Sequence, residues 1–252
     1  MQAGNGGGEG EQGAMPTRTP AKPRALLSWS SGKDAAWALH TLRRGGEVEV
    51  VGLLTTLNAA FDRVAMHAVR RALLEAQAEA AGLPLRAVPL PWPCSNAEYE
   101  AAMAGALAEA REEWGVTHIA FGDLFLEEVR TYRERQLDGT GLTPLFPLWG
   151  LPTGALAQEM VASGLGARLT CVDPNRLPLS FAGRAFDAAL LDALPPGADP
   201  CGEAGEFHTF AHAGPMFSRP IPVIVGEVVT RDGFVFADLL PRQGDHTDAD
   251  PT

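Results

Sequence analysis

The sequence predicts an α/β fold, in which helices cover both faces of a parallel sheet, joined to a smaller mixed α+β unit. Two observations predict this class. Through the first half of the chain, apolar runs of strand length alternate with longer segments of helical period, the pattern of parallel strands connected by helices. In the second half this alternation breaks down, and the chain ends in a β-hairpin pattern.

Composition and charge narrow the class of function. The 252 residues are 46% hydrophobic and 20% charged, which is typical of a folded globular protein. The formal net charge of -11 disfavours a DNA-binding surface, because such a protein repels phosphates. No run of about 18 apolar residues and no signal-peptide pattern are present, so neither a membrane partner nor secretion is expected. Three scattered cysteines favour a reducing compartment, and we expect a cytoplasmic protein, with an oligomer left open.

The two ends of the chain are expected to be disordered tails. Residues 1–23 are rich in Gly, Pro and polar residues, and residues 243–252 are acidic. The string from Gly8 to Gly13 matches the dinucleotide-binding fingerprint, but it follows no strand and opens no helix. We attribute that match to chance.

The first half contains four strand-helix alternations. The first strand is the apolar run 25–29, and a helix follows at 35–44, ended by Gly45 and Gly46. Further strands are expected at 48–57, 85–90 and 117–121. The intervening helices carry buried stripes and end signals: Val69, Leu73, Ala76 and Ala80 before Gly82, then Tyr99, Met103, Leu107, Ala110 and Trp114 after a cap at Ser95 or Asn96.

The second half is less regular. A Pro-rich segment at 142–154 leads into a helix at 153–163, a strand at 167–172 and a helix near 186–194. The hairpin at 221–241 turns at Arg231, Asp232 and Gly233. We expect a nucleotide-binding domain at 24–138 and a smaller domain with a mixed sheet at 139–242.

The turn after the first strand has the composition of a phosphate-binding loop. In an open parallel sheet, ligands bind beyond the carboxyl ends of the strands, where a phosphate meets the N–H groups that begin the next helix. The loop offers small residues, a cation and an acidic residue: Ser30, Ser31, Gly32, Lys33 and Asp34. A Walker A loop would need Gly at position 27 and Ser or Thr at 34, which rules that motif out. A plain polar turn is the alternative interpretation.

Other residues are expected at the same edge of the sheet. Gly122 and Asp123 end the fourth strand, where Asp123 could hold Mg²⁺, orient the attacking group or cap the next helix. Thr55 and Thr56 end the second strand and could line an adenine pocket, although Thr is also an ordinary strand residue.

The segment 200–210 concentrates titratable groups, as functional sites do. Substrate binding or proton transfer by Glu206 and His208 is the favoured interpretation. Zinc bound by Cys201, His208 and His212 and a hydrogen-bonded structural corner are the alternatives.

These segments resemble, in order, the diphthine ammonia ligase family over roughly residues 25–240: SSGKDA, FGDLFLEEVR, EMVASGLGA, LTCVDP and CGEAGEFHTF. The first resembles the Ser-Gly-Gly-Lys-Asp-Ser loop of the ATP pyrophosphatase superfamily. Ser31 replaces a Gly, which is tolerable if the backbone there avoids positive φ. Ala35 replaces the last Ser and deletes a hydroxyl that would touch phosphate.

The resemblance implies a Rossmann-like, adenine nucleotide alpha-hydrolase-like first domain that binds ATP and Mg²⁺. It further implies that a carboxylate is adenylated and that ammonia displaces AMP. In this scheme Lys33 neutralises the leaving pyrophosphate, Asp34 or Asp123 holds Mg²⁺, and Glu206 and His208 approach the acceptor. Heavy use of Ala, Gly, Arg and Pro indicates a bacterial-type member, so the acceptor is left open. The alternative is a nucleotide-binding regulatory protein with little or no turnover.

Overall fold

The computed structural model describes residues 21–64 and 68–242. Outside these ranges lie residues 1–20 of the first expected tail, which include the string from Gly8 to Gly13, and all of the second expected tail. Within them, no helix is long and apolar enough to cross a membrane.

The first sheet confirms the predicted α/β class. Its strands pair in the order β3-β2-β1-β5-β6, with β4 also paired to β2, and every pairing except β2–β3 is parallel. The four predicted strands are all present, and two short strands, β3 and β6, were not predicted. The bounds are β1 (Arg24–Ser28), β2 (Glu49–Asn58), β3 (Arg63–Val64), β4 (Leu85–Leu90), β5 (His118–Ala120) and β6 (Thr143–Leu145).

Helices bury this sheet on both faces. Successive side chains of a strand point to opposite faces, and Leu26 and Leu27 of β1 accordingly belong to two different core clusters. Leu27 packs in the cluster that contains residues of α1 and α2, and Leu26 in the cluster that contains residues of α3 and α4. The bounds are α1 (Lys33–Gly45), α2 (Arg71–Ala81), α3 (Asn96–Trp114) and α4 (Glu127–Leu137).

The helix ends follow the expected signals. Gly46 and Gly82 adopt positive φ of 68° and 65° after α1 and α2, a conformation that glycine reaches without steric cost. Of the two candidate caps of α3, Ser95 is the one used: its side chain accepts from the Glu98 N–H, and Glu98 bonds back to complete a capping box.

The second half forms a separate four-stranded sheet in the order β8-β7-β10-β9. All its pairings are antiparallel, so the expectation of a mixed sheet is wrong. The predicted terminal hairpin is present as β9 and β10, whereas β8 was missed because its residues were interpreted as a loop. The bounds are α5 (Thr153–Ala162), β7 (Gly166–Val172), η1 (Leu179–Phe181), α6 (Ala188–Asp192), β8 (Phe207–Ala213), β9 (Val223–Arg231) and β10 (Phe234–Pro241).

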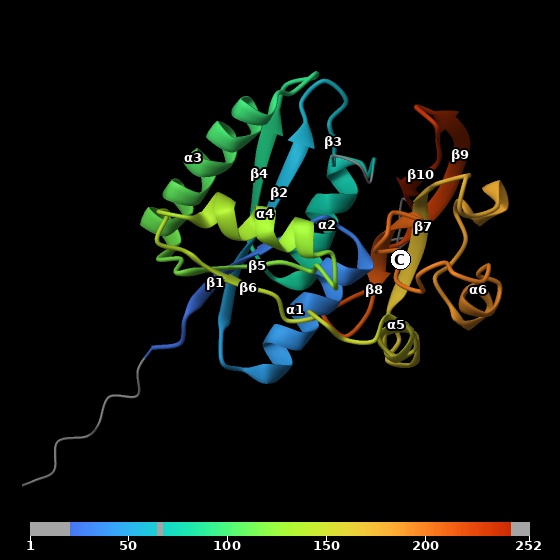
Figure 1. Cartoon of the computed structure of the whole chain (residues 1–252), viewed down its shortest axis with the longest axis horizontal. Coiled ribbons are helices and arrows are strands. Elements are labelled where there is room, and N and C mark those ends of the chain that lie inside the picture. The colour runs from blue at the N-terminus through green and yellow to red at the C-terminus, as the bar shows by residue number, and fades with distance from the viewer. Residues whose placement is uncertain (1–20, 65–67, 243–252) are drawn as a thin grey trace, which may run out of the picture.

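The two halves share one core. The larger buried cluster contains Leu39 of α1 and Leu73 of α2 together with Leu169 of β7 and Phe210 of β8. In Figure 1 the strands β7 to β10 form a layer beside the first sheet, with β8 next to α1. The division into domains at 24–138 and 139–242 stays a prediction, and β6 of the first sheet lies beyond residue 138.

Candidate functional site

The loop between β1 and α1 is buried against β8. Ser31 is fully buried and adopts a positive φ of 70°, so the condition that the backbone avoids positive φ at this position is not met. Its carbonyl oxygen accepts from the Ala211 N–H at 2.9 Å and from Gln77 Nε2 at 2.9 Å. These bonds hold a serine in a left-handed conformation that glycine reaches without steric cost.

Gln77 ties three elements together and was not predicted. From α2, its Nε2 donates to the carbonyl oxygens of Ser31 and Ala211, and its Oε1 accepts from Trp29 Nε1 at 2.9 Å. The side chain is fully buried, and both ends of its amide are hydrogen-bonded, as a buried polar group requires. The sequence signal that could have identified Gln77 is its position four residues after Leu73, where it is the polar residue on an otherwise apolar face of the helix.

Lys33 begins α1 and is covered by the second half of the chain. Its ammonium nitrogen lies 2.8 Å from each carboxylate oxygen of Asp34, donates to the carbonyl of Cys201, and has the rings of Phe186 and Phe207 at 5.4 and 5.5 Å. Burial is the largest influence and lowers the pKa of Lys33, but the Asp34 carboxylate together with Cys201 and Asp199 outweighs it and leaves that pKa above its usual value. The backbone N–H of Lys33 donates to Thr209 Oγ1 at 3.0 Å. Lys33 is therefore charged, and its partners in this conformation are protein groups.

Gly122 allows β5 to end directly against the start of α1. A Cβ at this position would lie 2.9 Å from the Ala35 nitrogen and 2.9 Å from the Asp34 carbonyl carbon, closer than real Cβ atoms approach backbone. Gly122 is thus brought together with the loop as expected, and its contacts are packing contacts.

Asp123 faces Arg133 of α4. Its Oδ2 is 3.5 Å from Arg133 Nε, and burial raises the pKa of Asp123 while the guanidinium lowers it, with a net rise. The cap of α4 is Leu126, and no side chain caps that helix, so the capping alternative for Asp123 is wrong.

Glu203 links the segment 200–210 to the first half. The sequence places it among the titratable groups of that segment, but no role was predicted for it. Its Oε1 accepts from the Leu124 N–H at 2.7 Å and the Phe125 N–H at 3.4 Å, immediately after Asp123. Burial raises the pKa of Glu203 to about 7, helped by the nearby carboxylates of Asp34 and Asp123 and opposed by these hydrogen bonds. The density of titratable groups in this segment was the signal that could have identified it.

Glu206 and His208 have different surroundings. Glu206 is buried, and its Oε1 accepts from the Asp199 N–H at 3.2 Å and from Arg176 Nη1 at 3.4 Å, both in the second half. His208 lies on β8, where burial and the positive charge of Lys33 lower its pKa to about 4. His208 is therefore neutral near pH 7 and lies within the electrostatic reach of Lys33.

Thr55 and Thr56 follow Leu54, the residue of β2 that pairs with Ser28. Thr55 is buried and Thr56 is partly exposed, and their predicted role in an adenine pocket stays a prediction.

The described ranges contain no group of three or more His, Cys, Asp and Glu side chains arranged to hold a metal, so the zinc alternative gains no support there. Burial raises the pKa of the Cys201 thiol to about 12, and its sulfur lies 3.4 Å from the Thr153 carbonyl. Mg²⁺ requires fewer protein ligands than zinc, because one or two carboxylates together with phosphate oxygens suffice to bind it. Asp34 and Asp123 are carboxylates of that kind, and their role in holding Mg²⁺ stays a prediction.

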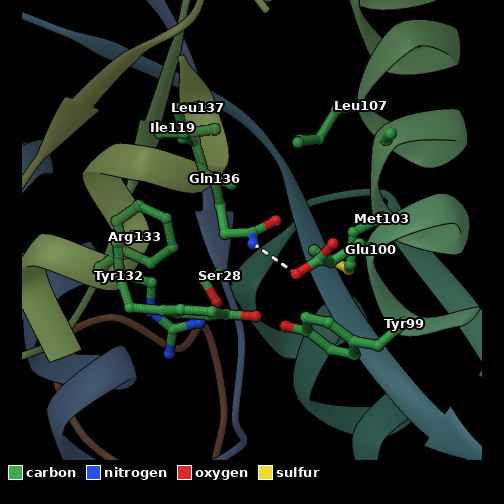
Figure 2. A pocket seen from close by; sticks show the side chains of 12 residues that line it. Ser28, Tyr99, Glu100, Met103, Leu107, Ile119, Tyr132, Arg133, Gln136 and Leu137 are labelled. Carbon is green, nitrogen blue, oxygen red and sulfur yellow. Dashed lines mark hydrogen bonds between the residues drawn. The ribbon is translucent and has the colours of Figure 1, made fainter. Parts of the chain in front are cut away.

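A small cavity lies beyond β1 on the face covered by α3 and α4 (Figure 2). Tyr99 and Tyr132 point their hydroxyl groups toward each other there, and Gln136 donates to Glu100 at 3.0 Å. The volume is about 50 Å³, whereas a water takes about 30 Å³ and ligand pockets enclose about 300 Å³ or more. In this conformation the cavity does not hold a nucleotide.

The mostly parallel sheet, with helices on both faces and a lysine-containing loop beyond its first strand, defines a Rossmann-like α/β protein. Residues 23–144 match the family described as diphthamide synthase N-terminal domain. The predicted family is thereby confirmed. The segment 200–210 lies outside the matched residues.

Among curated proteins, three enzymes named diphthine–ammonia ligase are similar to this chain. The protein from Bos taurus is 32% identical over 138 residues, 53% of this chain and 51% of the relative. Those from Danio rerio and Rattus norvegicus are 30% and 28% identical over 53% of this chain, and 54% and 51% of their own lengths. The chain thus spans about half the length of the curated relatives it matches.

Proposed function

We propose that the chain is an ATP-dependent ligase that converts a carboxylate into an amide with ammonia and releases AMP and pyrophosphate. The observation that carries this proposal is Lys33, a charged lysine at the amino end of the helix that follows the first parallel strand. It lies within the residues that match the diphthamide synthase family, and the relatives' name supports an amide-forming ligase. The acceptor is a carboxylate whose remaining structure is left open.

In the proposed reaction, an acceptor carboxylate oxygen attacks the α-phosphate of ATP, and the bond to pyrophosphate breaks. Ammonia then attacks the acyl carbon, AMP leaves, and the added nitrogen loses a proton. Lys33 and the N–H groups at the start of α1 stabilise the charge that develops on pyrophosphate, in a loop formed by Ser30, Ser31, Gly32 and Asp34. Thr55, Thr56 and Gly122 complete the nucleotide side of the site.

Phosphate must reach an ammonium group that is covered. Because the Cys201 carbonyl and the Asp34 carboxylate bind Lys33, we infer that the segment 199–206 shifts when ATP binds. Phosphate oxygens would then replace the carbonyl. Asp34 and Asp123 would hold Mg²⁺, which supplies further neutralisation of the phosphate charge.

The acceptor side of the proposed site comes from the second half. His208, which is neutral near pH 7, lies on β8 within the electrostatic reach of Lys33, and we propose that it contacts the acceptor. Glu206 holds the segment that carries Glu203, and Glu203 in turn binds the loop after Asp123. We accordingly propose that a nucleotide domain at 24–138 and an acceptor domain at 139–242 close on each other.

A regulatory protein that binds nucleotide without turnover is the second candidate. Ala35 favours it, because this buried residue contributes no hydroxyl to the loop, and its nitrogen is packed against Gly122. This candidate predicts ATP binding and no AMP release with any acceptor.

The two candidates separate in one assay. The full chain is incubated with ATP, Mg²⁺, ammonium and a panel of carboxylates, and AMP, ADP and pyrophosphate are quantified. A ligase releases AMP and pyrophosphate only with an acceptor, and Lys33→Ala reduces that release by about 100-fold or more. The chain has two lysines, and Lys22 is exposed, so Lys22→Ala is the matched control and should retain full release. Undiminished AMP release by folded Lys33→Ala protein would refute the proposal.

A further inference from the structure

The strand β9 is an apolar sheet edge. Among the described residues it pairs only with β10, and its side chains stay accessible: Ile224 is 48% exposed, Val225 36%, Val228 50% and Val229 38%. An edge that is long, apolar and open is a template for another strand, and soluble proteins usually protect such edges with charge, proline or a covering element.

The turn of the hairpin determines which groups of β9 point outward. Asp232 and Gly233 have φ of 52° and 84°, a two-residue turn of the I′ kind, and Arg231 pairs with Phe234 across it. The residues that flank such a turn exchange hydrogen bonds, and the pairs alternate from there. Val228 and Thr230 are therefore in non-hydrogen-bonded positions, with their N–H and C=O groups directed at the open edge.

Only a few two-fold registers let the outward groups of two β9 strands meet. If the two-fold axis passes through Glu227, the two Glu227 carboxylates lie opposite each other. If it passes through Val228, Glu227 lies opposite a valine of the other copy. When the two-fold axis passes through Val229, Val228 of one copy pairs with Thr230 of the other in a hydrogen-bonding position. Glu227 of each copy then lies opposite Arg231 of the other, so this contact is made twice. In the described parts of the chain Glu227 has no ion-pair partner. The Arg231 side chain is 56% exposed, and its contacts with the Asp232 carboxylate at 3.6 Å and with the Phe236 ring leave it accessible to a second carboxylate. Charge thus selects the register centred on Val229.

We propose that two copies of this chain associate through antiparallel β9–β9 pairing centred on Val229. The four-stranded sheets of the two copies then become one sheet of eight strands, and the same strand of each copy forms the contact, as in two-fold dimers generally. The pairing removes both apolar edges from water and gives Glu227 an ion-pair partner in Arg231 of the second copy.

A disulfide trap tests the register. At the two-fold axis Val229 faces its own copy in a non-hydrogen-bonded pair, with Cα atoms about 4.5 Å apart, within the range that a disulfide spans. The background is Cys94→Ser, because Cys171 and Cys201 are buried. Val229→Cys should form a covalent dimer on mild oxidation, and Glu227→Cys, which faces Arg231, should not. Equal cross-linking of both variants would contradict the register.

Charge exchange tests the interface itself. Sedimentation equilibrium of the wild-type chain should show a dimer, and Glu227→Arg or Arg231→Glu should each raise its dissociation constant by about tenfold. The double exchange should restore the wild-type value, which a general loss of stability would not do. Circular dichroism checks that each variant is folded. A monomeric wild-type chain at its highest soluble concentration, or a double exchange that stays weak, overturns the proposal.

Discussion

The ammonium group of Lys33 and the backbone carbonyl of Cys201 form a hydrogen bond between residues 168 positions apart in the chain. The bond joins the first turn of α1 to the segment 200–210, and it uses a main-chain atom. The side chain at position 201 is therefore not what holds the lysine.

Replacing Cys201 with Ala should leave turnover near the wild-type value. The carbonyl that contacts Lys33 is retained, and a thiol whose pKa is raised to about 12 by burial is not a nucleophile near neutral pH. Acceptor-dependent AMP release is the measurement, with Lys33→Ala as the inactive reference. A large loss in folded Cys201→Ala protein would mean that the thiol takes part in the reaction.

Gln77→Leu should destabilise the chain by about 2–4 kcal/mol, because it leaves three buried polar groups on Trp29, Ser31 and Ala211 without this partner. Urea unfolding measures the loss. Gln158→Leu, on an exposed position of α5, is the control and should change the free energy of unfolding by less than about 0.5 kcal/mol. Equal effects of the two substitutions would show that the Gln77 bridge contributes little.

Gly122→Ala should lower both stability and AMP release. The added methyl group meets the backbone of Asp34 and Ala35, which cannot move without displacing the loop, at a cost of about 1–3 kcal/mol. Gly105→Ala is the matched control, because its added Cβ meets nothing within 4 Å and alanine favours the helix α3. Thermal unfolding and the AMP assay are run on both, and only Gly122→Ala should be impaired.

Glu203 should make stability depend on pH. Its pKa rises from 4.5, the ordinary value of a glutamate in the unfolded chain, to about 7 in the fold, so the folded state holds a proton that the unfolded state has lost. That contribution is fully present below pH 4.5 and is lost as pH rises through about 7. Glu203→Gln should remove this dependence, and its stability relative to wild type should increase between about pH 5 and pH 8. Parallel pH profiles for the two proteins would contradict the shifted pKa.

The sequence allowed the first sheet and its helices to be predicted because their signals are local. Apolar runs such as 85–90 and caps such as Ser95 act over a few residues. The loop Ser30–Asp34 was found for the same reason, since its composition and its place after a strand are both visible in the sequence.

The remaining features depend on contacts between distant segments. Gln77 and Glu203 function through partners 46 and 79 residues away, and no local pattern specifies those partners. The strand β8 was missed because its strand-forming residues adjoin a cluster of titratable groups, which dominated the interpretation. The positive φ of Ser31 is likewise imposed by Gln77 and Ala211.

The hydrogen bonds from Lys33 to Thr209 and from Ala211 to Ser31 make β8 a scaffold for the loop. The loop cannot leave β8 one residue at a time, because both bonds flank the same short turn. Release of the loop from β8 is therefore a concerted event, and the backbone amides of Lys33 and Ala211 should exchange with solvent deuterium at a common rate.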